Sequence, residues 1–368
     1  MNIDDLYVPN CTSLSFSRFG KIFKKPNLSF MTVNMRSLGN KFDELIMYLS
    51  RLKQKFTFIL VTETWLTAQT DSSFEIPEYK SYSFYRDNQV GGGLKLYVLD
   101  HLNASKIELE SVGCESLLVN INIPGPGINQ IKICGIYRPP NKPVGDFFNF
   151  VEGLLEINTA NMVFLGDFNI NLNDVNSSVV HRYKNLFVSH GFQNEINLPT
   201  YVSPSGMIHS SCIDHFWHNI EIDCSSYVLK PNISDHLAVS VVFESELTDK
   251  PINIKFRDFS SNNINRYLAN IESEFNSFIC YDNVNQFSVY LVDFLVKILN
   301  KYFPLKTKSI FCRRIKAPWI TSRILKCINR KHRWYRMARN NIITFHSYRK
   351  CCKSLKALLK LANSQYYK

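Results

Sequence analysis

Short apolar runs that each end in polar side chains constrain this chain's fold more than any other feature. Runs with the length and composition of buried strands occupy residues 28–33, 56–61, 131–136, 162–165 and 237–243. Polar residues able to carry chemistry lie at or beside the end of every run. We expect an α/β architecture whose strand ends build one polar site.

The middle of the chain gives the strongest signal. Gly166-Asp167-Phe168-Asn169 follows one apolar run, and Ser234-Asp235-His236 precedes another. Because side chains alternate along a strand, Asp167 and Asn169 are expected on one face. An acid, an amide and an Asp-His pair at strand ends suit metal-assisted hydrolysis of a phosphodiester.

Other strand ends supply further candidates. Asn34 follows the first run, Glu63 the second, and Tyr137 and Arg138 the third. Asp214 lies inside a short apolar stretch, where an unpaired carboxylate would be costly. These residues extend the expected polar site.

Together these motifs resemble the endonuclease/exonuclease/phosphatase superfamily, which includes pancreatic deoxyribonuclease and the apurinic endonucleases. The motifs are Asn34, Thr62-Glu63-Thr64-Trp65, Tyr137-Arg138-Pro139-Pro140, Gly166-Asp167-Phe168-Asn169, Ile213-Asp214-His215 and Ser234-Asp235-His236. A closer resemblance, to the endonuclease domain of jockey-type non-LTR retrotransposons, rests on Asn34-Met35-Arg36-Ser37-Leu38, Glu63-Thr64-Trp65-Leu66 and Gly91-Gly92-Gly93-Leu94-Lys95-Leu96-Tyr97. The resemblance covers residues 28–244. It implies an α+β fold, a four-layer αββα sandwich, followed by helical basic C-terminal segments.

The resemblance also implies a role for each site residue. Metal ligands would be Asn34, Glu63 and Asp235. Catalytic residues would be Tyr137, Asp167, Asn169, Asp214 and His236, with Asp167 as the base for water and Asp214 orienting the His236 imidazolium. Substrate-binding residues would be Arg36, Arg138 and Thr200. The cofactor would be Mg²⁺, with Mn²⁺ as an alternative, because hard cations favour carboxylates and water.

The function we expect is nicking of target DNA, leaving a 3′-hydroxyl and a 5′-phosphate. In retrotransposons of this kind such a nick primes reverse transcription, although the chain contains no aromatic-Ala-Asp-Asp tetrad of a polymerase. Two alternatives stay open. One is a phosphoesterase of the same fold acting on abasic DNA, an inositol phosphate or a sphingolipid. The other is an inactive remnant that binds nucleic acid.

Charge divides the chain unevenly. Residues 301–368 hold 19 Lys and Arg and no Asp or Glu, whereas the whole chain has a net charge of +12. We therefore expect four parts: an N-terminal extension (1–27), the catalytic domain (28–247), a helical connector (248–300) and a basic helical tail (301–368). A tail of this charge should bind DNA or RNA, or else link to a further domain.

Location and oligomeric state are less constrained. We expect no signal peptide, no membrane segment and no membrane partner, and ten scattered cysteines favour free thiols in a reducing compartment. Residence inside the cell, with action in the nucleus, is the expected location. The sequence does not define an oligomer.

Some motifs have structural explanations. Trp65 and Trp217 are expected in the core, and the three glycines at 91–93 in a turn. His209, Cys212, His215 and His218 recur every third residue, but in a strand that spacing alternates faces and should not converge on zinc.

Overall fold

A computed structural model describes residues 10–25, 27–86, 91–124, 128–156, 161–203, 210–231, 233–246, 252–276, 283–310, 321–338 and 342–366. The chain forms two compact units. One comprises Met1–Thr248 with Arg313–Lys368, and the other Asp249–Cys312. In the described part of the chain, no helix is both long and apolar enough to cross a membrane.

A mixed seven-stranded sheet forms half of the larger unit. Its strands, in spatial order, are β1 (Cys11–Ser15), β14 (Cys224–Lys230), β15 (Ala238–Glu246), β2 (Asn27–Asn34), β3 (Phe58–Thr62), β5 (Leu94–Leu99) and β4 (Tyr79–Phe84). The pairs β1–β14 and β2–β3 are parallel, and the remaining pairs are antiparallel.

A six-stranded sheet forms the other half. Its order is β10 (Gln193–Asn194), β13 (Asp214–His218), β9 (Met162–Asp167), β8 (Gln130–Tyr137), β7 (Glu115–Asn122) and β6 (Asn103–Ile107). The central strands β8 and β9 are parallel. A separate short ribbon pairs β11 (Tyr201–Val202) with β12 (Ser210–Ser211).

The two sheets pack face to face around one core. Phe30 of the first sheet lies edge-on to Phe216 of the second, with ring centroids 5.1 Å apart. All residues of β3 and β9 are buried, which explains why these strands appear as nearly continuous apolar runs. The backbone at Gly135 approaches Leu60 so closely that a Cβ would lie 2.8 Å from it. The polar strand ends are therefore carried by a rigid double sheet.

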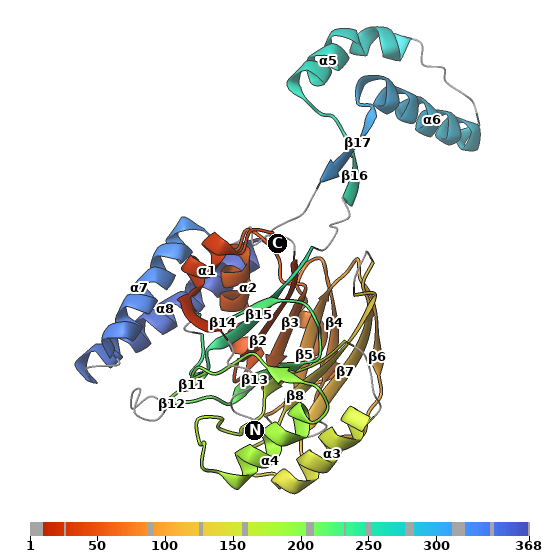
Figure 1. The fold of residues 1–368 in the computed structure, drawn as a ribbon. Coiled ribbons are helices and arrows are strands. Elements are labelled where there is room, and N and C mark those ends of the chain that lie inside the picture. The colour runs from red at the N-terminus through yellow and green to blue at the C-terminus, as the bar shows by residue number, and fades with distance from the viewer. Residues whose placement is uncertain are drawn as a thin grey trace. The chain divides into compact units, whose positions relative to one another are not determined.

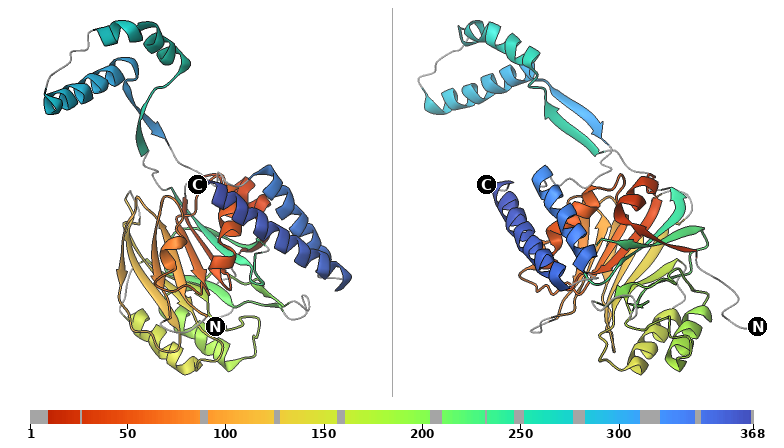
Figure 2. Two further views of the ribbon diagram at one scale, coloured as in Figure 1. Left: turned by 180° about the vertical axis from the view of Figure 1, so that it is seen from behind. Right: turned by 90° about the vertical axis from the view of Figure 1, so that its left-hand side faces the viewer.

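Helices cover both outer faces (Figures 1 and 2). On the seven-stranded sheet lie α1 (Phe16–Ile22), α2 (Phe42–Ser50), α7 (Ser322–Ala338) and α8 (Ile342–Tyr366), and on the six-stranded sheet α3 (Val144–Glu156) and α4 (Ser178–Val188). Single turns of 3₁₀ helix occur at Leu38–Asn40 and Asp71–Ser73. This arrangement confirms the expected αββα sandwich with helical C-terminal segments.

The boundaries of the sandwich differ from the expected 28–247. Strand β1 and helix α1 do not form a separate extension, because β1 pairs with β14 and Phe19 of α1 stacks on Phe56. At the other end, α7 and α8 bury apolar side chains in the same core, namely Ile324, Cys327, Leu355 and Leu359. Both termini of the chain thus complete the larger unit.

The smaller unit is a helical hairpin closed by a β-ribbon. Strands β16 (Ile252–Arg257) and β17 (Leu305–Ile310) pair antiparallel and enclose α5 (Ser261–Asn276) and α6 (Val284–Tyr302). Because β17 needs β16 as its partner, the connector extends beyond residue 300, and residues 301–310 belong with it rather than with the tail. The expected boundary at 247–248 lies outside the described residues.

Candidate active site

Five strand ends meet at one edge of the sandwich. Tyr137, Asp167 and Asp214 are direct neighbours across β8, β9 and β13, so their side chains share one face. Asn34 ends β2, beside Thr62 at the end of β3. The hollow at this edge is lined by Arg36, Glu63, Trp65, Tyr137, Pro140, Asp167, Asn169, Asn171, Tyr201, Ser211, Ile213 and His236.

A buried carboxylate–imidazole pair lies beneath the hollow. His236 Nδ1 is 2.9 Å from Asp214 Oδ2, and both side chains are almost fully buried. Tyr201 pairs with His236 through an isolated β-bridge, and their rings lie 5.1 Å apart. With Nδ1 engaged by Asp214, Nε2 is the nitrogen that remains for a substrate oxygen.

Thr200 fixes Asp214 and is not open to substrate. Its Oγ1 accepts hydrogen bonds from the backbone N–H groups of Asp214 (3.0 Å) and Ile213 (3.1 Å), and its own backbone accepts one from Leu237. The side chain is fully buried. The expectation that Thr200 binds substrate is therefore not met, because its hydroxyl is buried and is engaged by the backbone at Ile213 and Asp214.

Protonation at this cluster is set by burial and by charges held close together. Ligand atoms of Asp167, Asp214 and His236 all lie within 4.8 Å of one another. Burial raises the pKa of Asp167 to about 7, and Asp214 adds to the shift. Burial opposes the charge on His236, but the nearby carboxylates, Asp214 first, outweigh it and raise its pKa to about 9. Near neutral pH the imidazole is thus a cation and Asp167 can exchange a proton.

Asn34 joins two carboxylates. Its Nδ2 donates to Glu63 Oε1 and to Asp167 Oδ2, both at 2.8 Å, and its Oδ1 accepts from the backbone N–H of Arg36 at 3.1 Å. In this orientation Asn34 presents its nitrogen to both carboxylates, whereas the expectation is that its oxygen binds a metal. If the amide were turned, its oxygen would face two carboxylates, and only a cation between them would make that arrangement favourable.

The donor set at the hollow fits a hard divalent cation. Glu63 is half-buried and lines the hollow, and it converges with Asp167 on one hydrogen-bonding group. Mg²⁺ needs only one or two carboxylates because it keeps several waters. His236 is a poor ligand, since a protonated imidazole has no free lone pair. Asp235 is engaged elsewhere: its Oδ2 lies 2.5 Å from Arg36, at the rim.

Asp167 and Asn169 are held by a loop built around Arg138. The buried Arg138 guanidinium donates to the carbonyls of Phe168 (2.7 Å) and Asn169 (2.7 Å), and also to those of Pro139 and Lys142. In return, Asn169 Nδ2 donates to the Arg138 carbonyl at 2.8 Å. Arg138 therefore positions the loop, which differs from the expected contact with substrate. Burial, first, lowers its pKa.

Backbone strain is concentrated around the hollow. Among the described residues, seven non-glycine residues have positive φ, and five belong to the site loops: Arg36, Ser37, Glu63, Trp65 and Asn169. Such conformations cost about 1–3 kcal/mol each and persist where the surroundings impose them. Gly166 meets a related constraint, since its φ is +134° and a Cβ there would lie 2.0 Å from the Ile136 carbonyl. The strain argues that side-chain placement here outweighs local stability.

Tyr137 and Arg36 both line the hollow. Tyr137 is buried against the site, and burial, followed by the charges of Glu63 and Asp167, raises its pKa, so its hydroxyl stays a donor. Arg36 has a 47% exposed side chain and lies over the Tyr201 ring at 6.0 Å. Both are placed to contact an anion in the hollow.

The sequence interpretation missed two aromatic residues at the rim. Trp65 is 43% exposed, and its Nε1 donates to Glu63 Oε2 at 3.2 Å, so the expectation of a core position was wrong. Trp217 is 2% exposed and is confirmed in the core. Tyr201 was overlooked because no strand-end pattern marks it. Polar neighbours, such as Glu63 beside Trp65, are the signal that distinguishes a rim aromatic from a core one.

A turn of glycines supports the Glu63 loop. Gly93 has φ +88°, its N–H donates to Glu115 Oε2 at 2.6 Å, and its carbonyl accepts from Thr64. Gly92 accepts from Trp65 at 2.9 Å. The expected turn is therefore present, and it fixes the loop that carries Glu63.

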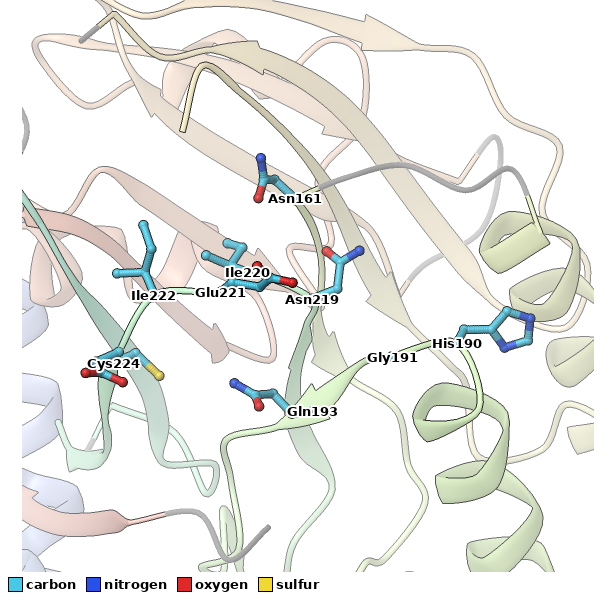
Figure 3. A pocket seen from close by; sticks show the side chains of 10 residues that line it. Asn161, His190, Gly191, Gln193, Asn219, Ile220, Glu221, Ile222 and Cys224 are labelled. Atoms are coloured by element: carbon cyan, nitrogen blue, oxygen red, sulfur yellow. The ribbon is translucent and has the colours of Figure 1, made fainter. Parts of the chain in front are cut away.

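A second hollow lies at the opposite end of β9 and β13 (Figure 3). Its lining includes Asn161, Gln193, Asn219 and Cys224. Beside it, His218 Nε2 lies 3.1 Å from Glu195 Oε1. Glu195, His218 and Cys224 could in principle hold a metal. However, His218 Nδ1 accepts the Ile220 N–H at 3.1 Å, which keeps the proton on Nε2 and opposes metal binding there.

The other members of the histidine series have separate partners. His215 is fully buried between Tyr183, whose hydroxyl lies 2.9 Å from Nδ1, and the Cys212 carbonyl, 3.1 Å from Nε2. His209 lies outside the described residues. Each described histidine of the series is thus held by its own hydrogen bonds.

No family model matches the chain, and no curated protein sequence matches it. Among solved structures, the chain is similar to the endonuclease domain of TRAS1, a telomere-specific non-LTR retrotransposon (14% identity, 60% of this chain and 99% of that chain, TM-score 0.49). It is also similar to the Xenopus laevis APE2 catalytic domain (14%, 60% and 92%, TM-score 0.47) and to an endonuclease/exonuclease/phosphatase family protein from Leptotrichia buccalis (16%, 59% and 99%, TM-score 0.42).

At these identities the similarity concerns the fold. The chain's own paired sheets and flanking helices form the sandwich that its motifs predicted. The expected αββα fold is therefore confirmed, and the activities named for those proteins belong to them.

Proposed function

We propose that the chain is a Mg²⁺-dependent endonuclease that hydrolyses a phosphodiester bond to nick DNA. The observation that carries the proposal is the cluster of Asp167, Asp214 and His236 under an open hollow, with Asp167 near its titration point and His236 cationic. A base and a cationic donor side by side are what attack of water on a phosphodiester requires.

The side chains divide the reaction between them. Asp167 accepts a proton from the attacking water, while Asn169 helps to hold that water. His236 donates a hydrogen bond from Nε2 to a non-bridging phosphate oxygen, whose negative charge grows in the transition state. Asp214 keeps the imidazole charged and correctly turned. The water oxygen bonds to phosphorus as the bond from phosphorus to the 3′ oxygen breaks, and the departing 3′ oxygen takes a proton from solvent, leaving a 3′-hydroxyl and a 5′-phosphate.

Two further groups bind the phosphate. The Tyr137 hydroxyl donates to one oxygen, and Arg36, half exposed at the rim, pairs with the backbone of the DNA. Glu63, with Asp167 beside it, would hold Mg²⁺ or Mn²⁺, which when bound neutralises charge on the phosphate. Asn34 positions both carboxylates.

On the retroelement-like motifs, we propose that this activity serves target-primed reverse transcription. In that setting the 3′-hydroxyl at the nick would serve as a primer, and the protein would act in the nucleus. The basic C-terminal segment would contact nucleic acid, with RNA as a second candidate partner.

Nicking of supercoiled plasmid tests the proposal. Purified full-length chain should convert supercoiled plasmid to open circles with Mg²⁺, and chelator should stop the reaction. His236→Ala, prepared in the same way, is the control for contaminating nucleases. Equal nicking by the variant, or cleavage of abasic DNA, inositol phosphates or sphingolipids in place of intact duplex, would reject the proposal. Binding of DNA without turnover would identify an inactive remnant.

A further inference from the structure

Helix α7 has two chemically distinct faces. Ile324, Cys327 and Lys331 face inward and are buried. Four exposed cations, Arg323, Lys326, Arg330 and Arg333, occur at i, i+3, i+7 and i+10. That spacing aligns them along one side of the helix. We call this set the α7 stripe.

The helical pair α7 and α8, which carries the stripe, contains no acidic residue to compensate its charge. Residues 322–366 contain no Asp or Glu. Helix α8, which packs along α7, adds exposed lysines at 350, 353 and 360. Arg323, Lys326 and Arg333 carry their charge on exposed side chains, and Arg330, also exposed, lies close to Cys327 and Cys351. Such a surface attracts polyanions.

The helix is anchored rather than loosely attached. Lys331 Nζ lies 2.5 Å from Glu44 Oε2, with both side chains largely buried. This pair ties α7 to α2, which begins just after Lys41. Breaking it by removing one partner would leave a buried charge, so the pair fixes where α7 can lie.

The same helix α2 is tied to the active site. Lys41 Nζ donates to the carbonyl of Met35, the residue that follows Asn34. The next residue, Arg36, lines the hollow and pairs with Asp235. A continuous set of contacts therefore connects α7 to the rim of the hollow, all within the larger unit.

We propose that the α7 stripe binds the phosphate backbone of the same DNA duplex whose scissile bond lies in the hollow. This rests on the proposed function and adds a second contact to it. The stripe spans roughly 15 Å at 1.5 Å per residue. Duplex DNA carries about one charge per 1.7 Å of its axis, so one stretch of backbone can meet all four cations. Duplex DNA is favoured over RNA because the substrate proposed for the hollow is DNA, and the stripe belongs to the same compact unit as the hollow.

Charge-neutralising variants test the stripe without disturbing the core. The variant carries Arg323→Gln, Lys326→Gln and Arg333→Gln, and leaves Arg330 in place. The matched control, Lys53→Gln, Lys80→Gln and Arg182→Gln, removes three exposed cations from other elements of the same unit. Thermal unfolding of both confirms folding. Shortening the chain is unsuitable because it would strip α7 and α8 from the core.

Binding is measured by fluorescence anisotropy with chelator present, so that no cleavage occurs. On a duplex of about 30 base pairs, roughly three turns, the stripe variant should bind at least tenfold more weakly than the control. Its slope of log affinity against log salt should be flatter by up to about 2.7, at about 0.9 for each of the three lost contacts. A duplex of about 10 base pairs, roughly one turn, offers fewer phosphates, so the difference between the two variants should be smaller.

Equal affinity and equal slopes for the two variants on the long duplex would overturn the proposal. A loss confined to RNA would overturn it too and would assign the stripe to a different ligand. Because these measurements need no turnover, they separate the stripe from the chemistry. If the full-length chain fails to nick plasmid and the stripe variant still binds DNA more weakly than the control, only the proposed nuclease activity is refuted.

Discussion

His236 Nδ1 lies 2.9 Å from Asp214 Oδ2, with both groups almost excluded from water. The pair receives further support from Thr200, whose hydroxyl accepts two backbone N–H groups on the Asp214 strand. One carboxylate oxygen, Asp214 Oδ1, is buried without a hydrogen-bond partner among the described residues. The negative charge of Asp214 is therefore compensated chiefly by the charged His236 imidazole, so the two residues should act as a unit.

Substitution of this pair is the first test. His236→Gln should lower kcat by about 100-fold or more with little change in KM, because the imidazolium acts mainly in the transition state. Asp214→Asn should cause a large part of the same loss, since the imidazole then loses its orienting charge. Steady-state kinetics on a labelled duplex measures both. The double variant should be scarcely worse than His236→Gln, and losses that multiply would show that the residues act independently.

The stability of the metal-free protein should depend on pH through His236. Its folded pKa of about 9 lies above the unfolded 6.5. Its stabilising contribution is therefore full below pH 6.5 and is lost as pH rises from 6.5 to 9. The 2.5-unit difference corresponds to a contribution on the order of 3 kcal/mol.

Urea unfolding with chelator, repeated across this pH range, measures the loss. Asp167, raised from 3.8 to about 7, gives a loss of the same sign at lower pH, so the decline from pH 7 to 9 isolates the histidine. His236→Gln should flatten that decline. A wild-type stability that rises from pH 7 to 9 would contradict the assigned protonation.

Periodicity and strand-end motifs located most of the site. Asn34, Tyr137 and Asp167 end strands whose apolar runs are long and buried on both faces, so pattern and position coincide. What each side chain contacts could not be derived in this way. Arg138 turns back onto four carbonyls, and Thr200 is buried under the strand it holds. These outcomes depend on tertiary packing that sequence spacing does not encode.

Domain boundaries were the weaker prediction for a related reason. Cys11–Ser15 is a short and polar segment, with a burial pattern typical of an edge strand, and it becomes a strand only because β14 offers it a partner. The basic tail gave a correct indication of amphipathic helices, but an apolar face with Ile324 and Leu355 does not by itself show that it docks on the sandwich. Long-range pairing decides both cases.

Glu63→Gln should remove metal binding while keeping the fold. Glutamine retains the oxygen that accepts from Asn34 but lacks the charge a hard cation needs. Saturating Mg²⁺, at about 100 times its dissociation constant, should stabilise the wild type by about 2.7 kcal/mol. The variant should gain almost nothing in the same thermal-shift titration. Glu221→Gln, an exposed change at the second hollow, is the control. An unchanged Mg²⁺-dependent thermal shift in Glu63→Gln would show that the metal binds elsewhere.

Both the stability of the protein and its activity should require a glycine at position 93. Its φ of +88° disfavours any side chain, and a Cβ there would lie 2.4 Å from Thr64 Oγ1. Gly93→Ala should therefore destabilise the protein by about 2 kcal/mol or more and displace the Glu63 loop, lowering Mg²⁺ affinity as well as Tm. Gly153→Ala is the matched control: it lies on α3 with no atom within 4 Å of the added Cβ, and helix propensity should make it more stable by about 0.5–1 kcal/mol. If the turn supports the site, calorimetry should show a lower Tm for Gly93→Ala and a higher Tm for Gly153→Ala, and Mg²⁺ titration should show weaker binding for Gly93→Ala. A Gly93→Ala protein with unchanged Tm and unchanged Mg²⁺ affinity would show that the turn contributes to neither.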